Sequence, residues 1–231
     1  MKRTPDARHD VPWPETEEPS EAVSNAIRDA CTRDLRPQRG LSAGARWVLS
    51  LLLPGAVIAI AGGVKALGRH DHALTADALG AAGWGVVQGV ALLVGLQAPP
   101  GRRIPHLART SIVVIVPVLF AAHLGLLGSH HLSLHEFLHA HLSGAVDCAL
   151  QSMLYGAFSA GAILLLWRAT DPFTPGLSGA LAGMAGGIAG AVAVGLACPD
   201  DEVWHRLVGH GLSVVLLPLG GWWAGRRWLT P

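Results

Sequence analysis

The sequence predicts an all-α membrane protein, a bundle of six transmembrane helices that follows a short N-terminal helix. Three observations indicate this fold class. Of the 231 residues, 51% are hydrophobic and only 14% are charged, whereas about a quarter of the residues in a soluble domain are usually charged. The mean hydropathy is +0.41, and the polar residues are concentrated between long apolar stretches. Glycine occurs 29 times, and small residues allow helix backbones to approach closely in lipid.

The same composition excludes several other classes of protein. A chain with this apolar content is neither a secreted disulfide scaffold nor a disordered polypeptide. The net charge of +1 provides no basic surface for DNA or RNA. We therefore expect the lipid bilayer as a partner and no direct binding of nucleic acid.

Residues 1–45 are predicted to form an N-terminal tail, and residues 46–231 the six-helix transmembrane domain. Residues 1–19 combine proline with polar residues, a composition typical of disorder. Residues 20–36 predict a helix, because Ser20 can cap its start and Pro37 ends it. Its candidate partner-binding residues are apolar ones at helical spacing and the charged ones beside them, namely Val23, Ile27, Cys31, Leu35, Arg33, Asp34 and Arg36. So short a helix is marginal in water, so it either lies on the bilayer or the bundle, or folds into a groove on a cytosolic partner.

A transmembrane helix needs about 20 mostly apolar residues. Six stretches meet this requirement, at residues 47–64, 78–98, 110–128, 148–167, 176–197 and 207–225. The fifth contains overlapping Gly-x-x-x-Gly pairs, which place glycines on one face of a helix. We expect this fifth helix to be the central, tightly packed one.

The orientation follows from the basic residues between the spans, since cytoplasmic loops are enriched in Lys and Arg. If the N-terminus is cytoplasmic, 14 of the 17 basic residues lie on the cytoplasmic side. The outer side then holds Lys65, Arg69 and Arg206. Both termini are therefore predicted to be cytoplasmic.

This orientation collects metal-ligating and redox-active residue types on the outer side. Ten of the twelve histidines lie there, and Cys148 and Cys198 fall at the same level of the membrane. Asp147, Asp200, His205 and His210 are close to these cysteines in sequence. Thiolate, imidazole and carboxylate groups bind zinc and similar divalent metals, and an oxidising compartment also permits a disulfide. Cys148 and Cys198 are thus candidate redox or metal sensors, and the alternative is that each only packs as a small side chain.

The third outer connection contains His135-Glu136-Phe137-Leu138-His139, a match to the H-E-x-x-H motif of zinc proteases. Ser133 and Glu136 also form an S-x-x-E capping box, which explains the glutamate without catalysis. We expect a short amphipathic helix at the outer interface, with accessory metal binding by His135 and His139 as the alternative. The six spans contain no acid for ion transport and no nucleotide-binding motif, so an enzyme or a pump is not expected.

Three segments carry a resemblance to a known family. They are Thr32-Arg33-Asp34-Leu35-Arg36-Pro37 in the tail, Cys148 at the start of the fourth span, and Cys198-Pro199-Asp200-Asp201 with His205 and His210-Gly211. From about Ala30 to its end, the chain resembles the NrsF-type anti-sigma factors of the bacterial inner membrane. These are six-span proteins with a short cytoplasmic N-terminal region, and cysteines matching Cys148 and Cys198 are implicated in their response to signals.

The resemblance implies an anti-sigma factor. The tail would sequester an extracytoplasmic-function sigma factor, and heavy metal or oxidative stress at the outer face would release it. Two alternatives stay open from the residues themselves. The first is a metal-handling membrane protein that uses the outer His and Cys residues without a sigma-factor partner, and the second, weaker one is a membrane protease.

Overall fold

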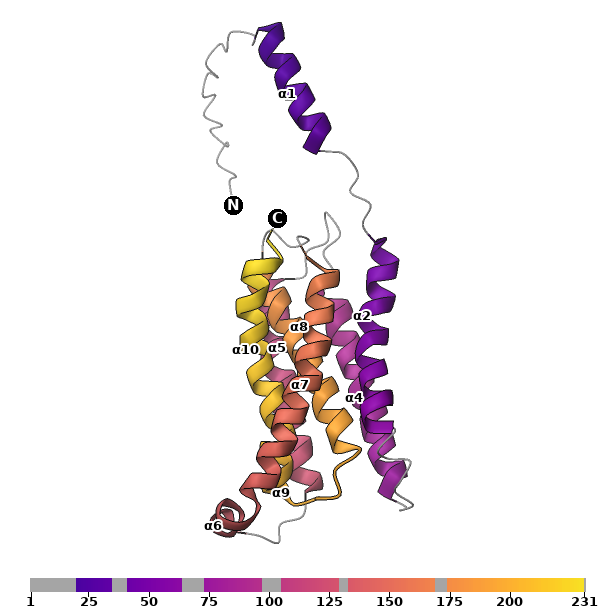
Figure 1. Cartoon of the computed structure of the whole chain (residues 1–231), viewed down its shortest axis with the longest axis vertical. Helices are drawn as coiled ribbons and strands as arrows, with labels where there is room; N and C mark the ends of the chain where they lie inside the picture. Colours follow the sequence, from indigo (N-terminus) through magenta and orange to yellow (C-terminus); the bar gives the residue numbers. More distant parts are fainter. Residues whose placement is uncertain are drawn as a thin grey trace, which may run out of the picture. The chain divides into compact units, whose positions relative to one another are not determined.

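The computed structural model describes residues 20–34, 41–63, 73–96, 105–128, 133–168 and 174–230. Within these residues every regular element is a helix (Figure 1). The chain divides into two compact units, Met1–Gly40 and Leu41–Pro231, and each is described by itself. The predicted all-helical class is confirmed for the described part of the chain.

The first unit contains helix α1 (Glu21–Asp34). Ser20 begins it, since its hydroxyl accepts the Val23 backbone N–H at 3.4 Å. Val23 and Ile27 are one helical turn apart, and their side chains are 48% and 56% exposed. The predicted binding residues Cys31, Arg33 and Asp34 also belong to α1. Leu35 and Arg36 of the predicted binding set, and residues 1–19, fall outside the described residues.

The second unit is a bundle of long helices that lie side by side (Figure 1). Its elements are α2 (Ala43–Val57) continuing as the π-helix η1 (Ile58–Gly63), α4 (Ala73–Leu96), α5 (His106–Leu127), α6 (Leu134–Glu136), the π-helix η2 (Phe137–His141), α7 (Leu142–Leu166), α8 (Pro175–Gly195), α9 (Val203–Arg206), the π-helix η3 (Leu207–Gly211) and α10 (Leu212–Trp228).

Five helical segments of this unit are long and apolar enough to cross a membrane. They are Gly44–Gly63, His106–Leu126, Leu142–Leu166, Pro175–Gly195 and Val203–Trp228. The predicted second span, residues 78–98, coincides with much of α4, whose continuous apolar section Leu79–Val94 is shorter than a full span. The structure therefore supports a polytopic membrane protein, and the count of six spans stays a prediction.

Helix α8 occupies the centre of the bundle, as its glycine pattern predicts. Of its most apolar section, 94% is buried inside the protein. Gly179 and Gly183 face α10, where added Cβ atoms would overlap the backbone carbonyls of Gly221 and Leu217. Gly190 faces α7 in the same way, against the Ser152 carbonyl. Helix α8 therefore packs with its backbone directly against α7 on one face and against α10 on another.

The helical segment before α7 differs from the expected separate interfacial helix. α6 begins at Leu134 and runs through η2 directly into α7, so the chain is helical from residue 134 to residue 166. The predicted fourth span starts at Cys148, but α7 starts at Leu142 and places Cys148 in its second turn. The capping box explains why the helical segment begins at Leu134. It satisfies backbone N–H groups of the first turn next to Ser133, so the helix start lies there and not near Cys148.

Candidate functional site

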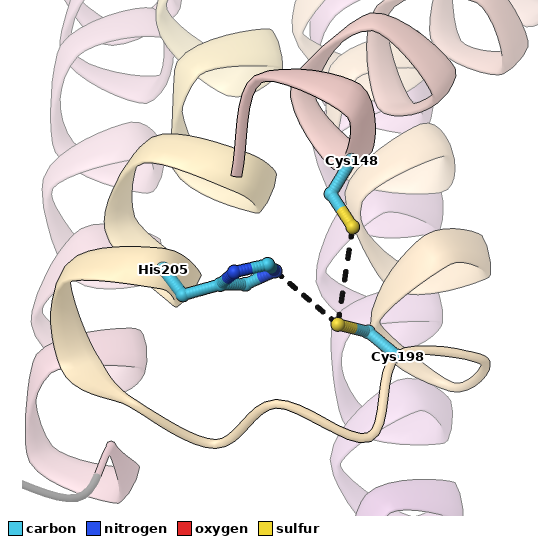
Figure 2. Close-up of side chains that lie close together, drawn as sticks. All are labelled: Cys148, Cys198 and His205. Carbon is cyan, nitrogen blue, oxygen red and sulfur yellow. Dashed lines mark hydrogen bonds between the residues drawn. The ribbon is translucent and has the colours of Figure 1, made fainter. Parts of the chain in front are cut away.

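Cys148, Cys198 and His205 converge at one end of the bundle, and we call them the thiol–imidazole cluster. Figure 2 shows the two thiols facing each other, with the imidazole of His205 directed at Cys198. The two Sγ atoms are 3.9 Å apart, and Cys198 Sγ lies 3.3 Å from His205 Nε2. Both cysteines are free thiols. The three donor atoms lie within 4.8 Å of one another, close enough to act on a single ligand.

Three different elements position these side chains. Cys148 lies on α7 and His205 on α9, whereas Cys198 follows the end of α8, where its backbone N–H donates to the Val194 carbonyl at 2.9 Å. Gly209 of η3 gives the cluster its space, because a Cβ there would lie 3.1 Å from the Cβ of Cys148 and 3.4 Å from His205 Nε2. The cluster thus depends on how α7, the segment after α8, and α9 with η3 pack at one end of the bundle.

A hydrogen bond holds α7 and η3 together beneath the cluster. Ser152 lies one turn beyond Cys148, is fully buried, and donates its hydroxyl to the Gly209 carbonyl at 3.1 Å. A serine in this position satisfies a carbonyl inside the helical segment and ties it to the neighbouring helix. The separation between Cys148 and the histidines on α9 and η3 is therefore constrained.

Two carboxylates orient the imidazole of His205. Asp200 Oδ2 lies 3.1 Å from His205 Nδ1, and the carboxylate of Glu202 accepts the backbone N–H groups of Trp204 and His205 at 2.6 and 3.2 Å. Glu202 is 5% exposed, so this helix cap is buried. With Nδ1 bonded to Asp200, Nε2 is the nitrogen that faces Cys198, and it can take the thiol proton. The order carboxylate, imidazole, thiol is the arrangement that activates a nucleophilic sulfur.

The reactivity of Cys198 follows from this arrangement. Burial raises the pKa of its thiol, but hydrogen bonds from the imidazoles of His205 and His210 outweigh that effect and lower the pKa to about 5. A thiol with this pKa is a thiolate at neutral pH, which is the form that attacks electrophiles and binds metals. The sulfur of Cys198 is therefore the reactive one that the geometry prepares.

His210 joins the site through the π-helix η3. Residues five apart do not share a face of an α-helix, yet the rings of His205 and His210 have centroids 5.7 Å apart. The wider i→i+5 turn of η3 brings them together, and such π-segments often occur at functional sites. His210 is 3% exposed, and its Nδ1 has no hydrogen-bond partner within the described structure.

The donor set fits a tetrahedral metal ion. Two thiolates bound to one zinc ion at about 2.3 Å each would lie about 3.8 Å apart, close to the 3.9 Å between the two sulfur atoms. The imidazole of His205 adds a third ligand of a type that zinc accepts. The same pair of sulfurs could instead close a disulfide by moving toward the bond length of about 2.05 Å.

A small cavity adjoins the cluster and is lined by residues of α4, α5, α8, α9 and η3. It has a volume of about 80 Å³, and its polar lining residues are His123, Asp200, Arg206 and His210. The apolar part of its wall includes Trp84, whose ring lies edge-on to that of His123 with centroids 5.6 Å apart. The cavity lies next to the cluster, because its lining residues Asp200 and His210 both contact the side chain of His205.

The other predicted ligands lie elsewhere. Asp147 is exposed on α7, and its carboxylate is not among the converging donor atoms of the described residues. His135 and His139 are exposed, and their rings lie side by side at a tilt of 56° with centroids 4.4 Å apart. The capping box is confirmed, because Glu136 accepts both the N–H and the hydroxyl of Ser133 at 2.8 Å, and these bonds lower the pKa of its carboxyl group. The carboxylate of Glu136 therefore caps the start of α6, which accounts for the glutamate of the H-E-x-x-H match.

Glu202, Gly209 and Arg206 also belong to the site, although none of them is among the predicted site residues. Glu202 could have been found as a candidate helix cap just before Val203, whereas Gly209 and Arg206 have no signal apart from their place in the fold.

Comparison with protein families gives one match. The family model described as "NrsF: Negative regulator of sigma F" matches residues 31–230. Neither the curated proteins nor the solved structures provide a match. The matched region includes the whole bundle of described helices and the end of α1, so it contains the thiol–imidazole cluster.

Proposed function

The chain belongs to the NrsF family, the negative regulators of sigma F, and from this premise we propose that it is a membrane-bound anti-sigma factor for an extracytoplasmic-function sigma factor. The observation that carries the proposal is the family match over residues 31–230. The family is one of regulators and not of enzymes, and the engagement of Glu136 by Ser133 argues in the same direction. A metal-handling protein without a sigma factor would leave this membership unexplained.

The tail is the proposed sigma-binding element. Helix α1 has only 14 residues, and its apolar side chains Val23 and Ile27 are exposed on one face. Such a helix gains stability when it buries that face in a hydrophobic groove of another protein. Because the family match begins at residue 31, the segment that follows Ile27 is also part of the proposed binding element.

The proposed location is the bacterial inner membrane with both termini in the cytoplasm. The excess of Lys and Arg on one side of the predicted spans supports this orientation. In the bundle, Arg226 and Arg227 lie in the last turn of α10, whereas His205 of the thiol–imidazole cluster lies in the first turn of the same membrane span, Val203–Trp228. The cluster would then face the periplasm, where thiols can be oxidised.

The cluster is the proposed receiver of the signal, which is a divalent metal or an oxidant. A metal would be held by the thiolates of Cys148 and Cys198 and the imidazole of His205. An oxidant would accept two electrons as the two thiols lose their protons and their sulfurs form a bond. A disulfide would draw the ends of α7 and α8 together, because the two sulfurs are 3.9 Å apart and a disulfide bond is about 2.05 Å long. A metal ion would instead hold α7, α8 and α9 close to their present spacing, because each contributes or adjoins one of its ligands.

Helix α8 is proposed to connect the end of the bundle that holds the thiol–imidazole cluster with the opposite end. Cys148 and the end of α7 at Leu166 are about 27 Å apart along the helix axis. Over that distance α8 packs backbone against backbone on α7 and α10, so a shift at one end moves a rigid unit. A coupling of about 1–3 kcal/mol between the two ends is typical of such regulation.

The test is co-purification of the full-length protein with candidate sigma factors. Ile27→Asp places a charge in the exposed apolar face of α1, and Asn25→Asp places the same charge on the opposite face as a matched control. We expect Ile27→Asp to release the sigma factor and to raise transcription from its promoters, with Asn25→Asp near wild type. Equal sigma-factor retention by wild type and Ile27→Asp would refute the assignment of α1.

A further inference from the structure

A groove of about 940 Å³ opens between α5 and α10 at the end of the bundle opposite the thiol–imidazole cluster. The first turns of α8 form its floor, where Gly176 and Ala180 carry little or no side chain. Figure 1 shows α5, α8 and α10 next to one another along the bundle. The groove is therefore a surface of the membrane-embedded part of the protein.

The groove is apolar along its length and polar at one end. Val113, Leu177, Pro218 and Leu219 line its inner part, within the spans of α5, α8 and α10. The polar lining residues lie where the helices begin or end, and they are His106, Thr110, Thr174, Arg226 and Thr230. A ligand that fits this distribution is an amphiphile, with its apolar part parallel to the helices and its headgroup at the helix ends.

The charge at the polar end of the groove indicates what kind of headgroup the ligand carries. Among the described residues, those that line the groove include Arg226 and no carboxylate. The guanidinium of Arg226 lies over the Trp222 ring, 4.8 Å from its centroid, which holds the cation at the mouth. Behind the rim, the buried guanidinium of Arg109 donates to the hydroxyls of Thr174 and Ser178 and so fixes Thr174 at the mouth. This end of the groove is complementary to a negative charge.

Gly176 allows the mouth to have this form. A Cβ at Gly176 would lie 2.8 Å from the indole Nε1 of Trp222 and 3.0 Å from Cγ of Arg226. Both side chains therefore lie directly against the start of α8, beside Thr174. A tryptophan and an arginine at the end of a transmembrane helix are placed where lipid headgroups lie.

We propose that this groove binds an anionic phospholipid, with an acyl chain along α8 between α5 and α10 and the phosphate beside Arg226. Basic pockets between transmembrane helices commonly bind acidic headgroups by this combination of cation and hydroxyl donors. The lipid fills a space that α5 and α10 leave open and contacts α8, the central helix of the bundle.

Native mass spectrometry of the full-length protein in detergent tests this proposal, with phosphatidylglycerol and phosphatidylethanolamine of the same acyl chains as probes. Arg226→Gln removes the charge at the mouth, and Arg227→Gln removes the same charge from the neighbouring exposed residue, which does not line the groove. We expect phosphatidylglycerol to bind more tightly than phosphatidylethanolamine. Arg226→Gln should weaken phosphatidylglycerol binding by about fivefold, the factor that corresponds to ~1 kcal/mol per basic residue at a membrane surface, and Arg227→Gln should not.

A second pair of variants tests the acyl-chain site. Val113→Trp fills the groove, whereas Val114→Trp adds the same ring at the adjacent, 58% exposed position outside it. We expect Val113→Trp to weaken the binding of both lipids and Val114→Trp to weaken neither. Equal effects within either pair of variants would overturn the proposal, as would a dimer that covers the groove and retains no lipid.

Discussion

Gly221 provides a sharp test of the packing on which the account depends. It lies on α10 against α8, and an added Cβ would overlap the Gly179 carbonyl oxygen and lie 3.0 Å from the Cα of Gly183. Its neighbour Gly220 is on the same helix and has no atom within 4 Å of the corresponding position. Gly221→Ala and Gly220→Ala are therefore the same chemical change at two adjacent sites, only one of which meets another helix.

The magnitude follows from the contacted atoms. Carbon atoms in contact normally lie about 3.5–4.0 Å apart, so the new methyl group is at least about 0.5 Å too close to the Gly183 Cα. Backbone atoms cannot rotate away, so α8 and α10 must separate. Overpacking of this kind costs about 1–3 kcal/mol, and we expect a value near 3. The gain in helix propensity, up to ~1 kcal/mol, is common to both variants and cancels in their difference.

The assay is reversible unfolding in mixed micelles with increasing dodecyl sulfate, followed by tryptophan fluorescence. A difference of about 3 kcal/mol between the variants corresponds to roughly a 100-fold change in the unfolding equilibrium constant. Gly220→Ala should be as stable as wild type or slightly more stable. If the two variants unfold within about 0.5 kcal/mol of each other, α8 and α10 are not packed backbone to backbone, and the proposed rigid connection is wrong.

Three further outcomes follow from the site. The rate at which iodoacetamide alkylates Cys198, followed by mass spectrometry, should have its pH midpoint near 5. Alkylation should be slow below that pH, where the thiol is protonated, and fast above it. A midpoint near the usual thiol pKa of about 8.5 would contradict the hydrogen-bonded thiolate. Gly209→Ala should slow oxidative cross-linking of Cys148 to Cys198 on a non-reducing gel, because the new Cβ lies 3.1 Å from that of Cys148, and cross-linking at the wild-type rate would show that Gly209 provides no needed space. Glu136→Gln should leave sigma-dependent reporter output unchanged, since Glu136 serves the helix start, and a loss of repression would reassign it.

Much of the bundle could be predicted from local patterns. Long apolar stretches indicate membrane helices because the bilayer sets their length, and the glycine spacing identified α8 as the central helix. Cys148 and Cys198 could be placed at one level because they mark the return of the chain across the membrane. Each of these inferences needs only the period of a helix and the thickness of a bilayer.

The details of the site could not be predicted, because they depend on contacts between segments. The π-helix η3 brings His205 and His210 together, although a regular α-helix would separate them. The segment after Cys198 turns so that Asp200 meets His205, which nothing in the order of residues requires.

We propose that the thiol–imidazole cluster controls how tightly the tail binds a sigma factor. The most direct measurement is the amount of sigma factor that stays bound to the full-length protein in membranes before and after addition of zinc or hydrogen peroxide, in wild type and in the Cys148→Ala/Cys198→Ala variant. We expect one of the two additions to release the sigma factor from wild type and neither to release it from the variant. Release from both proteins to the same extent would contradict the account.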